Sequence, residues 1–359
     1  MPGVYLSYPF CAQKCTYCNF ASGVFPQELE PRYLARLAAE IESTKWEWTP
    51  ETLYWGGGTP SLMPLDWLSS LHAKLPGRPW LEATMEAAPG SLTNERLHAW
   101  RDAGITRVSL GVQSFVPKEI ARTGRKHTAE IVEDEVRRLR SAGIADFNLD
   151  LIAGLAGQTR ESWRESLDWI EKLNPPHVSV YILEVDEDSR LGAELMLGGV
   201  RYGAGDVPSD ELIVELYETA VERLKGLGIE RYEISNFARP GHQSRHNLKY
   251  WQLTPYLGFG ADAHSFDGRE RWQNVESAQE YVAQNKTMAR EAAQPEQERF
   301  FVGLRLMQGM EPTPQEWQQY AEPIGRFIAM GLLEKVGERL RLTSRGVLLS
   351  NDVFQEFLS

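Results

Sequence analysis

The sequence predicts an α/β protein in which a partial barrel of parallel strands is followed by a smaller helical domain. Three observations predict this fold. Short apolar segments alternate with amphipathic segments of helical period as far as about residue 185. Residues suited to binding and catalysis follow several of these apolar segments. Near the end of the chain the pattern changes to helices followed by a hairpin.

Six strand-like segments alternate with helical segments in the first part of the chain. The predicted strands are residues 4–7, 52–55, 81–87, 107–110, 147–152 and 177–183. The helical patterns between them are residues 28–43, 64–75, 93–103, 130–142 and 160–172. Because short apolar strands separated by amphipathic helices imply βαβ crossovers, we expect a parallel sheet. At least six such units are enough for an open or partial barrel of the (β/α)6 type.

Distinctive residues gather where these strands end. Three cysteines follow the first strand and the glycines 56–58 follow the second. Glu86 lies on the third strand, Gln113 follows the fourth and Asp150 lies in the fifth. Ligands of parallel α/β proteins bind at the carboxyl ends of the strands. The repeated placement therefore supports both the barrel and a site at that end of it.

The pattern loosens beyond residue 185. We predict a glycine-rich loop at 192–205, a helix at 210–225 and a last strand at 231–234. Helices at 296–307, 313–320 and 323–330 lead to strands at 332–336 and 339–342, which is typical of a winged-helix-like unit. This unit has no basic face, so we expect it to serve packing or interaction rather than DNA binding. The predicted parts are a core barrel at 1–235, a connecting segment at 236–290 and a C-terminal helical domain with a terminal hairpin at 291–359.

The composition is that of a globular protein with an acidic balance. Of 359 residues, 42% are hydrophobic and 25% charged, and 38 Lys and Arg against 50 Asp and Glu give a net charge of −12. The densest basic cluster, Arg137, Arg138 and Arg140, lies among acids on a helical pattern, which indicates a solvated face. We therefore expect no nucleic-acid partner.

The sequence shows no signal for export or membrane insertion. No apolar run approaches the roughly 18 to 20 residues of a spanning helix. The first residues lack both the basic region and the apolar stretch of a signal peptide. The expected compartment is the cytoplasm.

Cys11, Cys15 and Cys18 are the three cysteines of the chain, and they lie within eight residues of one another. An odd, clustered set favours ligation or redox chemistry over disulfides. A structural zinc site closes with four ligands, and no fourth cysteine or nearby histidine is present. Three thiolates can instead hold a four-iron cluster with one iron open to a chelating small molecule. A zinc site completed by a distant histidine and three buried, inert cysteines are the alternatives.

The spacing of these cysteines, with Tyr17 before the last one, resembles the signature of the radical S-adenosylmethionine family. The resemblance implies a [4Fe-4S] cluster whose unique iron is chelated by S-adenosyl-L-methionine. It also implies an electron donor, since one electron from the cluster cleaves the sulfonium to a 5′-deoxyadenosyl radical. The glycines after the second strand resemble the Gly-Gly-Glu element that holds the methionine amino group. By themselves they are equally compatible with a tight turn.

Four further segments, in order along the chain, resemble one subfamily. They are residues 107–115, 124–127, 148–152 and 154–159. With the cysteine loop they are similar to the oxygen-independent coproporphyrinogen III oxidases and the related heme chaperones. The likeness covers most of residues 4–270, and it is fainter in the C-terminal part. Ala88 and Ala156 depart from the pattern, and neither is a proposed ligand.

This resemblance implies two groups of cofactor-binding residues. The group expected to line one S-adenosylmethionine is Tyr5, Gly57, Glu86 and His264. The group expected around a second cofactor region is Tyr17, Gly58, Thr59, Gln113, Arg125, Asp150 and Glu184. For each residue alone, a surface salt bridge or a strand-end cap is the competing interpretation.

Two features separate the sequence from the oxidase. The oxidase signature continues with a fourth cysteine, whereas Asn19 and Phe20 follow the third cysteine here. The oxidase also has a long segment before its first strand, whereas the cluster loop here begins ten residues into the chain. Both features lead us to expect a heme chaperone rather than a porphyrinogen oxidase.

A third feature is the segment from His246 to Trp251, which resembles the His-Asn-x-x-Tyr-Trp motif of the chaperones. The resemblance makes His246 a candidate axial ligand of heme iron, and imidazole suits that role. A hydrogen-bonded structural histidine is the competing interpretation, and His242 could compete for the metal.

The expected function is therefore to bind heme and to transfer it to an unidentified heme-acceptor protein. Oxidative decarboxylation of coproporphyrinogen III is the alternative, and a radical enzyme with another substrate is a third. Contact with a membrane would suit a heme carrier, although no basic amphipathic helix supports it.

Overall fold

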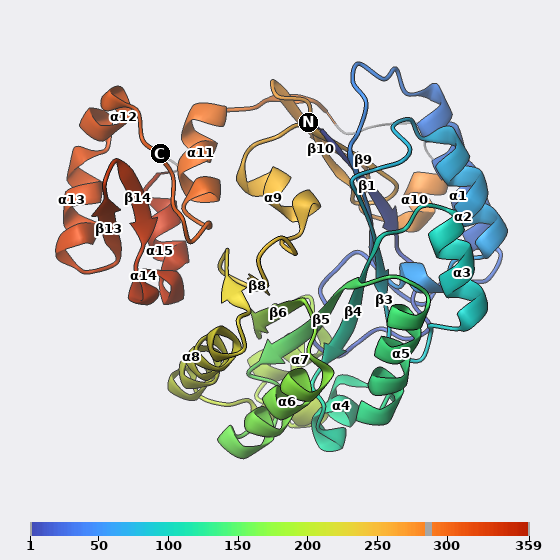
Figure 1. Cartoon of the computed structure of the whole chain (residues 1–359), viewed down its shortest axis with the longest axis horizontal. Helices are drawn as coiled ribbons and strands as arrows, with labels where there is room; N and C mark the ends of the chain where they lie inside the picture. The colour runs from blue at the N-terminus through green and yellow to red at the C-terminus, as the bar shows by residue number, and fades with distance from the viewer. Residues whose placement is uncertain (1, 284–288, 358–359) are drawn as a thin grey trace.

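The computed structural model describes residues 2–283 and 289–357 of the chain. Its main body is one 12-stranded sheet with the order β12-β11-β10-β9-β1-β2-β3-β4-β5-β6-β8-β7. The strands β1 to β6 are neighbours in chain order, and each pairs in parallel with the next. Figure 1 shows that the sheet curves around a central space with helices on its outer side. The predicted partial barrel is confirmed.

The elements of the barrel match the predicted segments to within three residues at each end. The strands are β1 (Gly3–Tyr8), β2 (Thr52–Gly57), β3 (Glu82–Ala87), β4 (Arg107–Gln113), β5 (Asp146–Ala153) and β6 (His177–Ile182). The helices are α1 (Leu29–Ser43), α2 (Leu65–Lys74), α3 (Asn94–Asp102), α5 (Ala129–Ser141) and α6 (Arg160–Leu173). The short helix α4 (Pro117–Thr123) was not predicted.

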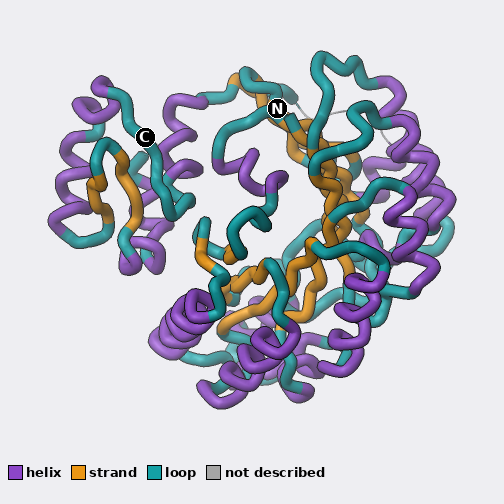
Figure 2. Tube along the Cα trace, in the orientation of Figure 1, coloured by secondary structure: helices purple, strands orange, loops and turns teal. Residues whose placement is uncertain are grey.

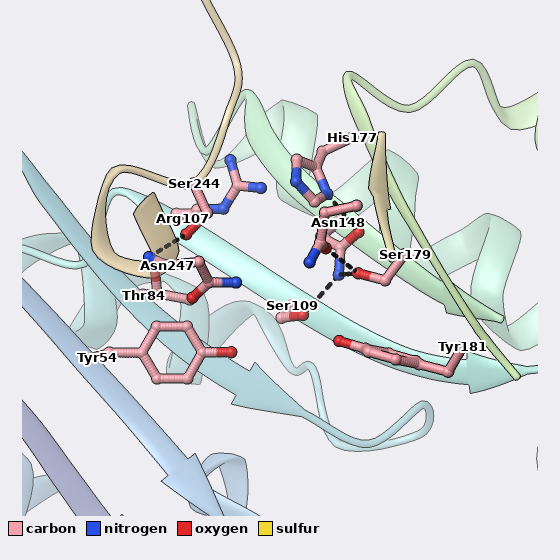
Figure 3. Close-up of a pocket in the computed structure, with 11 residues that line it drawn as sticks. Tyr54, Thr84, Arg107, Ser109, Asn148, His177, Ser179, Tyr181, Ser244 and Asn247 are labelled. Atoms are coloured by element: carbon pink, nitrogen blue, oxygen red, sulfur yellow. Dashed lines mark hydrogen bonds between the residues drawn. The ribbon is translucent and has the colours of Figure 1, made fainter. Parts of the chain in front are cut away.

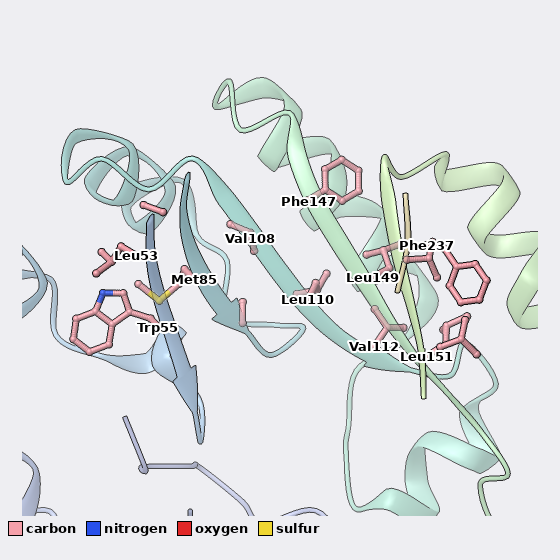
Figure 4. Packing of buried hydrophobic residues seen from close by; sticks show 14 of the residues in the cluster. Leu53, Trp55, Met85, Val108, Leu110, Val112, Phe147, Leu149, Leu151 and Phe237 are labelled. Carbon is pink, nitrogen blue, oxygen red and sulfur yellow. The ribbon is translucent and has the colours of Figure 1, made fainter. Parts of the chain in front are cut away.

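Helices cover the outer face of the sheet (Figure 2), and the hydrophobic core packs between the two (Figure 4). Alternation along the strands creates this arrangement, because successive side chains point to opposite faces. In β4, for example, Val108, Leu110 and Val112 are buried in the core (Figure 4). The residues between them, such as Ser109, belong to the concave face. The sheet therefore has an apolar face toward the helices and a polar concave face. The concave face is the one available to ligands.

Further strands extend the sheet at both edges. On the side of β1 they are β9 (Tyr256–Phe259), which is parallel to β1, and the antiparallel β10 (His264–Phe266), β11 (Glu270–Gln273) and β12 (Glu291–Ala292). On the side of β6 they are β8 (Asn236–Ala238) and β7 (Glu230–Arg231). Much of segment 236–290 is thus part of the same sheet, and it also contains α9 (Arg245–Trp251) and α10 (Ala278–Ala283). The domain boundaries remain predictions.

Two predictions between residues 185 and 235 are wrong. The predicted loop at 192–205 contains most of α7 (Arg190–Met196) and of the 3-10 helix η2 (Arg201–Asp206). Gly192 is helical, and a Cβ there would lie 1.9 Å from the carbonyl oxygen of Asp186, so close packing rather than a loop requires this glycine. The predicted strand at 231–234 is also wrong, because β7 ends at Arg231 and the chain turns to pair β8 with β6.

The C-terminal part is a small domain beside the barrel (Figure 1). Its elements are α11 (Pro295–Gly303), α12 (Pro314–Gln319), α13 (Ala321–Ala329), β13 (Leu333–Val336), β14 (Arg339–Leu342), α14 (Ser344–Leu348) and α15 (Ser350–Gln355). The predicted hairpin is confirmed, and the predicted helix 210–225 is α8 (Asp210–Gly226). The helix predicted at 296–307 ends at Gly303, because Leu306 bridges to Glu233 of the barrel. None of the helices in the described ranges is long and apolar enough to cross a membrane.

Candidate functional site

The loop with the three cysteines follows β1 at the carboxyl end of the barrel. Backbone hydrogen bonds hold it on both sides. Cys11 N donates to Gly23 O at 2.8 Å, Thr16 N donates to Thr123 O at 3.1 Å, and Leu191 N donates to Thr16 O at 2.8 Å. All three cysteines are half-buried free thiols. The loop is therefore fixed by the rest of the chain while its thiols stay available.

The surroundings of the thiols suit metal-bound thiolates. Burial raises the pKa of Cys11, while hydrogen bonds from the side chains of Thr59 and Ser22 lower it. Burial acts to lower the pKa of Arg125, but the neighbouring Tyr17 and Cys15 outweigh it, and that pKa is raised. Arg125 thus lies beside the cysteine loop as a buried, charged group.

The zinc alternative needs several metal ligands close together. In residues 2–283 and 289–357, no three His, Cys, Asp or Glu side chains lie close enough together to hold one ion. A multi-iron cluster is larger than one ion and accepts thiolates that lie farther apart. Three thiolates can hold a four-iron cluster with one iron open, so the donor set fits the cluster that the sequence predicts.

The glycines after β2 are explained by close contact with the cysteine loop. Gly57 has φ +108°, a backbone conformation that favours glycine. A Cβ on Gly58 would lie 2.7 Å from the carbonyl carbon of Pro9. Gly58 N donates to Tyr8 O at 2.8 Å, and Thr59 N to Phe10 O at 2.9 Å. The turn interpretation is therefore correct for the backbone, and it also places these residues against the cluster loop.

A cavity of about 120 Å³ lies next to the cysteine loop. Its lining residues are Tyr5, Ser7, Phe20, Ala21, Ser22, Gly57, Glu86 and Asp262. Tyr5, Gly57 and Glu86 were predicted to line one S-adenosylmethionine, and the structure brings them together here. His264 was predicted with them, but it is exposed at the start of β10 and does not line this cavity.

Asp262 was missed by the sequence analysis. It follows β9 with φ +61°, and Gln273 Nε2 donates to its Oδ1 at 2.6 Å. The rule that functional residues follow parallel strands would have found it, had β9 been recognised as a strand. β9 is short and contains Gly258, which weakened its signal.

Glu86 is the titratable group of this cavity at neutral pH. Burial raises its pKa to about 7, a hydrogen bond from Tyr54 lowers it, and the nearby Asp150 raises it. The Tyr54 hydroxyl donates to Glu86 Oε1 at 2.8 Å. A cationic ligand group would ionise this carboxyl, so Glu86 suits an amino group or ribose hydroxyls.

The second predicted group is only partly brought together. Gln113 has φ +71° at a bulge between β4 and β5, and its buried Oε1 has no hydrogen-bond partner among the described residues. Arg125 Nη1 donates to Gly111 O at 2.8 Å. Asp150 accepts from Asn148 Nδ2 at 2.5 Å.

A strained residue with an unpaired buried oxygen is typical of a ligand site, so the observations at Gln113 favour it as a contact residue. Arg125 and Asp150 interact electrostatically with each other, which places them in one neighbourhood. Glu184, by contrast, is exposed beyond β6.

The helix α9, which contains the His246 motif, lies at the opposite end of the barrel. A Cβ on Gly3, at the start of β1, would lie 3.1 Å from His246 Cε1. The buried Glu82 carboxylate accepts from Arg245 N and His246 N, each at 2.9 Å. This acid at the amino end of the helix fastens α9 to the first residue of β3.

The His246 ring is 1% exposed and hydrogen-bonded at both nitrogens. Its Nδ1 lies 2.9 Å from Thr52 Oγ1, and its Nε2 lies 2.9 Å from the Tyr250 hydroxyl. Burial, with a smaller effect of Lys249, lowers its pKa to about 3, so the ring is neutral. In this conformation His246 is a structural histidine, and iron binding requires that one nitrogen be released. The rival His242 is paired instead with Asp146.

The end of the motif contacts the C-terminal domain. The Arg305 guanidinium lies over the Trp251 ring at 4.3 Å from its centre. Arg305 also pairs with the buried Glu233 at 3.6 Å. The C-terminal domain is thus in direct contact with α9.

Two family models and several curated proteins match this chain. A model of the radical SAM superfamily matches residues 5–170, and a model of the HemN C-terminal domain matches residues 295–349. A protein named heme chaperone HemW from Lactococcus lactis is 32% identical, with 99% of this chain and 96% of the relative covered. A protein of the same name from Mycobacterium tuberculosis is 34% identical, with 99% of this chain and 94% of the relative covered.

Among solved structures, the radical SAM coproporphyrinogen III oxidase HemN from Escherichia coli has the same fold. The TM-score is 0.85 at 22% sequence identity, with 100% of this chain and 90% of that chain covered. At this identity the likeness concerns the fold, which both proteins share over nearly their whole length.

Proposed function

Since the chain belongs to the heme chaperone HemW family of the radical SAM superfamily, we propose that it binds heme and transfers it to an acceptor protein. The observation that carries this proposal is α9. This short helix contains His246, Tyr250 and Trp251, and Glu82 anchors the helix at the amino end of the barrel. A metal-ligating imidazole beside aromatic rings is suited to a flat, iron-containing macrocycle.

The same proposal assigns a [4Fe-4S] cluster to Cys11, Cys15 and Cys18, and S-adenosylmethionine to the adjacent cavity. When bound, this pair supplies one-electron chemistry at the open iron. Tyr5, Gly57 and Glu86 would surround the amino acid part, and Glu86 would hold its cationic amino group. Gln113, Arg125 and Asp150 would act at the far side of the cofactor. An electron donor for the cluster is the corresponding partner.

Porphyrinogen oxidation is less well supported. Phe20 follows the third cysteine where the oxidase pattern has a fourth, and its side chain is 65% exposed at the cavity. The relatives that match nearly the full chain at 32% and 34% identity are named heme chaperones. The fold alone does not separate the two activities, because the oxidase shares it.

Heme binding through His246 requires a local rearrangement. One of the two hydrogen bonds of the His246 ring must break, which costs about 1 kcal/mol for a typical hydrogen bond. An Fe–imidazole bond can offset a cost of this size. We therefore expect α9 to move when heme binds, and we place this binding and transfer in the cytoplasm.

The test is a heme titration of the anaerobically reconstituted protein, followed by absorbance. We expect near-stoichiometric binding in wild type and a changed spectrum with weaker binding in His246→Ala. His242→Ala is the matched control, because His242 lies four residues earlier and is paired with Asp146. Unaltered heme binding by His246→Ala would remove this histidine from its role. Catalytic conversion of coproporphyrinogen III by the wild type would overturn the chaperone function.

A further inference from the structure

A second, polar chamber lies inside the barrel between the strands and α9 (Figure 3). It shares no lining residue with the cavity beside the cysteines, and none of the proposed cofactor ligands lines it. Its walls come from β2 to β6, from β8 and from the start of α9. The lining residues are Tyr54, Thr84, Arg107, Ser109, Asn148, His177, Ser179, Tyr181, Asn236, Ser244 and Asn247.

Arg107 gives this chamber a positive charge. It is 3% exposed, and its Nη1 donates to the carbonyl oxygen of His242 at 3.1 Å. That bond uses one of the five N–H donors of a guanidinium. Across residues 2–283 and 289–357, no carboxylate forms an ion pair with Arg107. The lining of the chamber contains no Asp or Glu.

The acids near Arg107 have other partners. Asp146, its register partner on β5, pairs with His242. The carboxylate of Glu82 accepts hydrogen bonds from the Ser244 hydroxyl and from two backbone N–H groups of α9. His177 contributes no second charge, because burial lowers its pKa well below the usual value and Arg107 lowers it further. Arg107 is therefore a largely buried cation with one hydrogen bond to the described residues. A buried charge of this kind is costly unless an opposite charge joins it.

The rest of the lining is suited to receiving a carboxylate. In Figure 3 the hydroxyl groups of Tyr54 and Tyr181 point toward one another across the chamber. Thr84 is fully buried, and its Oγ1 has no hydrogen-bond partner within the part of the chain that the structure describes. Guanidinium binds carboxylate through paired, charge-assisted hydrogen bonds, and hydroxyl groups add further donors.

The chamber adjoins the candidate heme ligand. Asn247 lines it and directly follows His246 in the chain. Tyr54 also lines it, and its ring stacks on the His246 ring with 5.2 Å between centres. A ligand whose centre is bound by His246 would therefore have its periphery beside this chamber.

We propose that Arg107 binds a carboxylate in this chamber, and that the carboxylate is a propionate of the heme whose iron His246 takes. This inference rests on the proposed function and assigns to it a residue that recognises the side chains of the porphyrin. Arg107 would thereby make binding depend on free propionates rather than on the macrocycle alone.

Entry of the propionate requires one wall to move. The chamber has a volume of about 10 Å³, which is room for about one water molecule. Most of its walls are paired strands of the barrel. The exception is the seven-residue α9 with Ser244 before it, which the same event must displace to free a nitrogen of His246. One movement of α9 would open both sites together.

The test compares heme with heme dimethyl ester, in which both propionates are uncharged. The cluster-loaded protein is titrated with each compound, and the ratio of the two Kd values is measured. We expect wild type to bind heme at least about tenfold more tightly than the diester, since a charged hydrogen-bonded pair is involved. In Arg107→Gln the ratio should fall to about two or below.

Three further measurements keep the test decisive. Arg107→Lys retains the charge and should retain a preference for free propionates, and Arg101→Gln, an exposed arginine paired with Asp102, should behave as wild type. S-adenosylmethionine affinity should be unchanged in Arg107→Gln. If that affinity fell while the heme preference stayed, the carboxylate would be that of the methionine, and the assignment to heme would be overturned.

A full heme preference in Arg107→Gln, or none in wild type, would also overturn the inference. If neither compound bound to wild type, the proposed function itself would fail, and the two failures are thereby distinguishable.

Discussion

Tyr54 is a residue that contacts both candidate sites at once. Its hydroxyl donates to Glu86 beside the cofactor cavity, and its ring stacks on His246 of α9. It also stacks on Tyr5, with 6.1 Å between ring centres. A single side chain in the middle of the barrel therefore touches the proposed cofactor residues on one side and the proposed heme ligand on the other.

Tyr54→Phe should change the titration of Glu86. The hydrogen bond from Tyr54 stabilises the ionised carboxylate and lowers its pKa, so its loss should raise that pKa above about 7. If ionised Glu86 holds the cationic amino group of S-adenosylmethionine, affinity rises with pH through this pKa. The midpoint should then move to higher pH by about one unit, the equivalent of roughly 1.4 kcal/mol. Binding measured from pH 5.5 to 8.5 checks this.

Tyr181→Phe serves as the control, because its hydroxyl lies in the polar chamber and forms no hydrogen bond with Glu86 in the described residues. The same midpoint in Tyr54→Phe and wild type would show that Glu86 does not control binding.

Gly58→Ala should impair the cluster loop. Its Cβ would meet backbone atoms of Pro9 and Phe10 at 2.7 and 2.8 Å, and backbone cannot move aside as a flexible side chain can. Overpacking of this kind costs about 1 to 3 kcal/mol. We expect severalfold less iron bound after anaerobic reconstitution, measured by iron content and absorbance. Gly325→Ala is the control, since no atom lies within 4 Å of its added Cβ and its φ is helical. Equal iron content in both variants would contradict this account.

At the scale of elements, α9 is a short helix whose position depends on a residue far away in the sequence. It has seven residues, and isolated helices of that length are unstable in water. Glu82 of β3 accepts from its first two backbone N–H groups, while Thr52 of β2 binds its histidine. Side chains of two strands of the sheet thus stabilise the helix.

Glu82→Gln should loosen α9 without unfolding the barrel. The change removes the negative charge at the helix amino terminus, where an acid contributes about 0.3 to 1 kcal/mol and more when partly buried. We expect faster hydrogen exchange at the backbone amides of residues 245–251, with the strands of the barrel protected as in wild type. Glu95→Gln, in the exposed first turn of α3, is the control. Unchanged exchange in α9 would mean that other contacts hold this helix.

The elements that could be predicted from the sequence are those with a strong local period. β1 to β6 alternate with helices such as α1, whose buried Leu34, Leu37, Ala38 and Ile41 follow the helical repeat. The short elements α9 and β9 depend on partners distant in sequence, so their local pattern is weak. The loop predicted at 192–205 was wrong for a related reason. Gly192 is needed for a close contact with the backbone of Asp186 and not for a turn.

The candidate site divides in the same way. The cysteines, Gly57 and Glu86 follow predictable strands, and their positions could be expected. The environment of His246 could not, because Thr52 lies 194 residues earlier in the chain and only the folded barrel brings it to the ring. The buried charge of Arg107 is likewise visible only once the strands are paired.

At the scale of the whole molecule, the two candidate sites lie at opposite ends of the barrel. The cysteines follow the last residue of β1, and His246 packs against Gly3 at its start. A six-residue strand spans about 20 Å at 3.3 Å per residue. Heme bound to His246 would thus be separated from the cluster by the length of the barrel. The C-terminal domain contacts the heme end, through Arg305 on Trp251.

Arg305→Met should destabilise this contact in a way that depends on pH. Burial raises the pKa of Glu233, and Arg305 lowers it again. Removal of the guanidinium leaves a buried carboxylate without its partner, which costs about 3 to 5 kcal/mol for a buried pair. The pKa of Glu233 in the folded protein then rises further above its unfolded value. Stability is consequently lost as pH rises, and the deficit relative to wild type should be larger at pH 8 than at pH 5.5.

Chemical unfolding at the two pH values measures this deficit. Glu233→Gln combined with Arg305→Met should recover most of the loss at pH 8, since the unpaired charge is gone. Arg339→Met, which removes an exposed pair with Glu311, should cost about 1 kcal/mol or less at either pH. A deficit in Arg305→Met that is equal at both pH values would assign the stabilisation to packing on Trp251. The C-terminal domain would then be held to α9 by the aromatic contact and not by the buried charge.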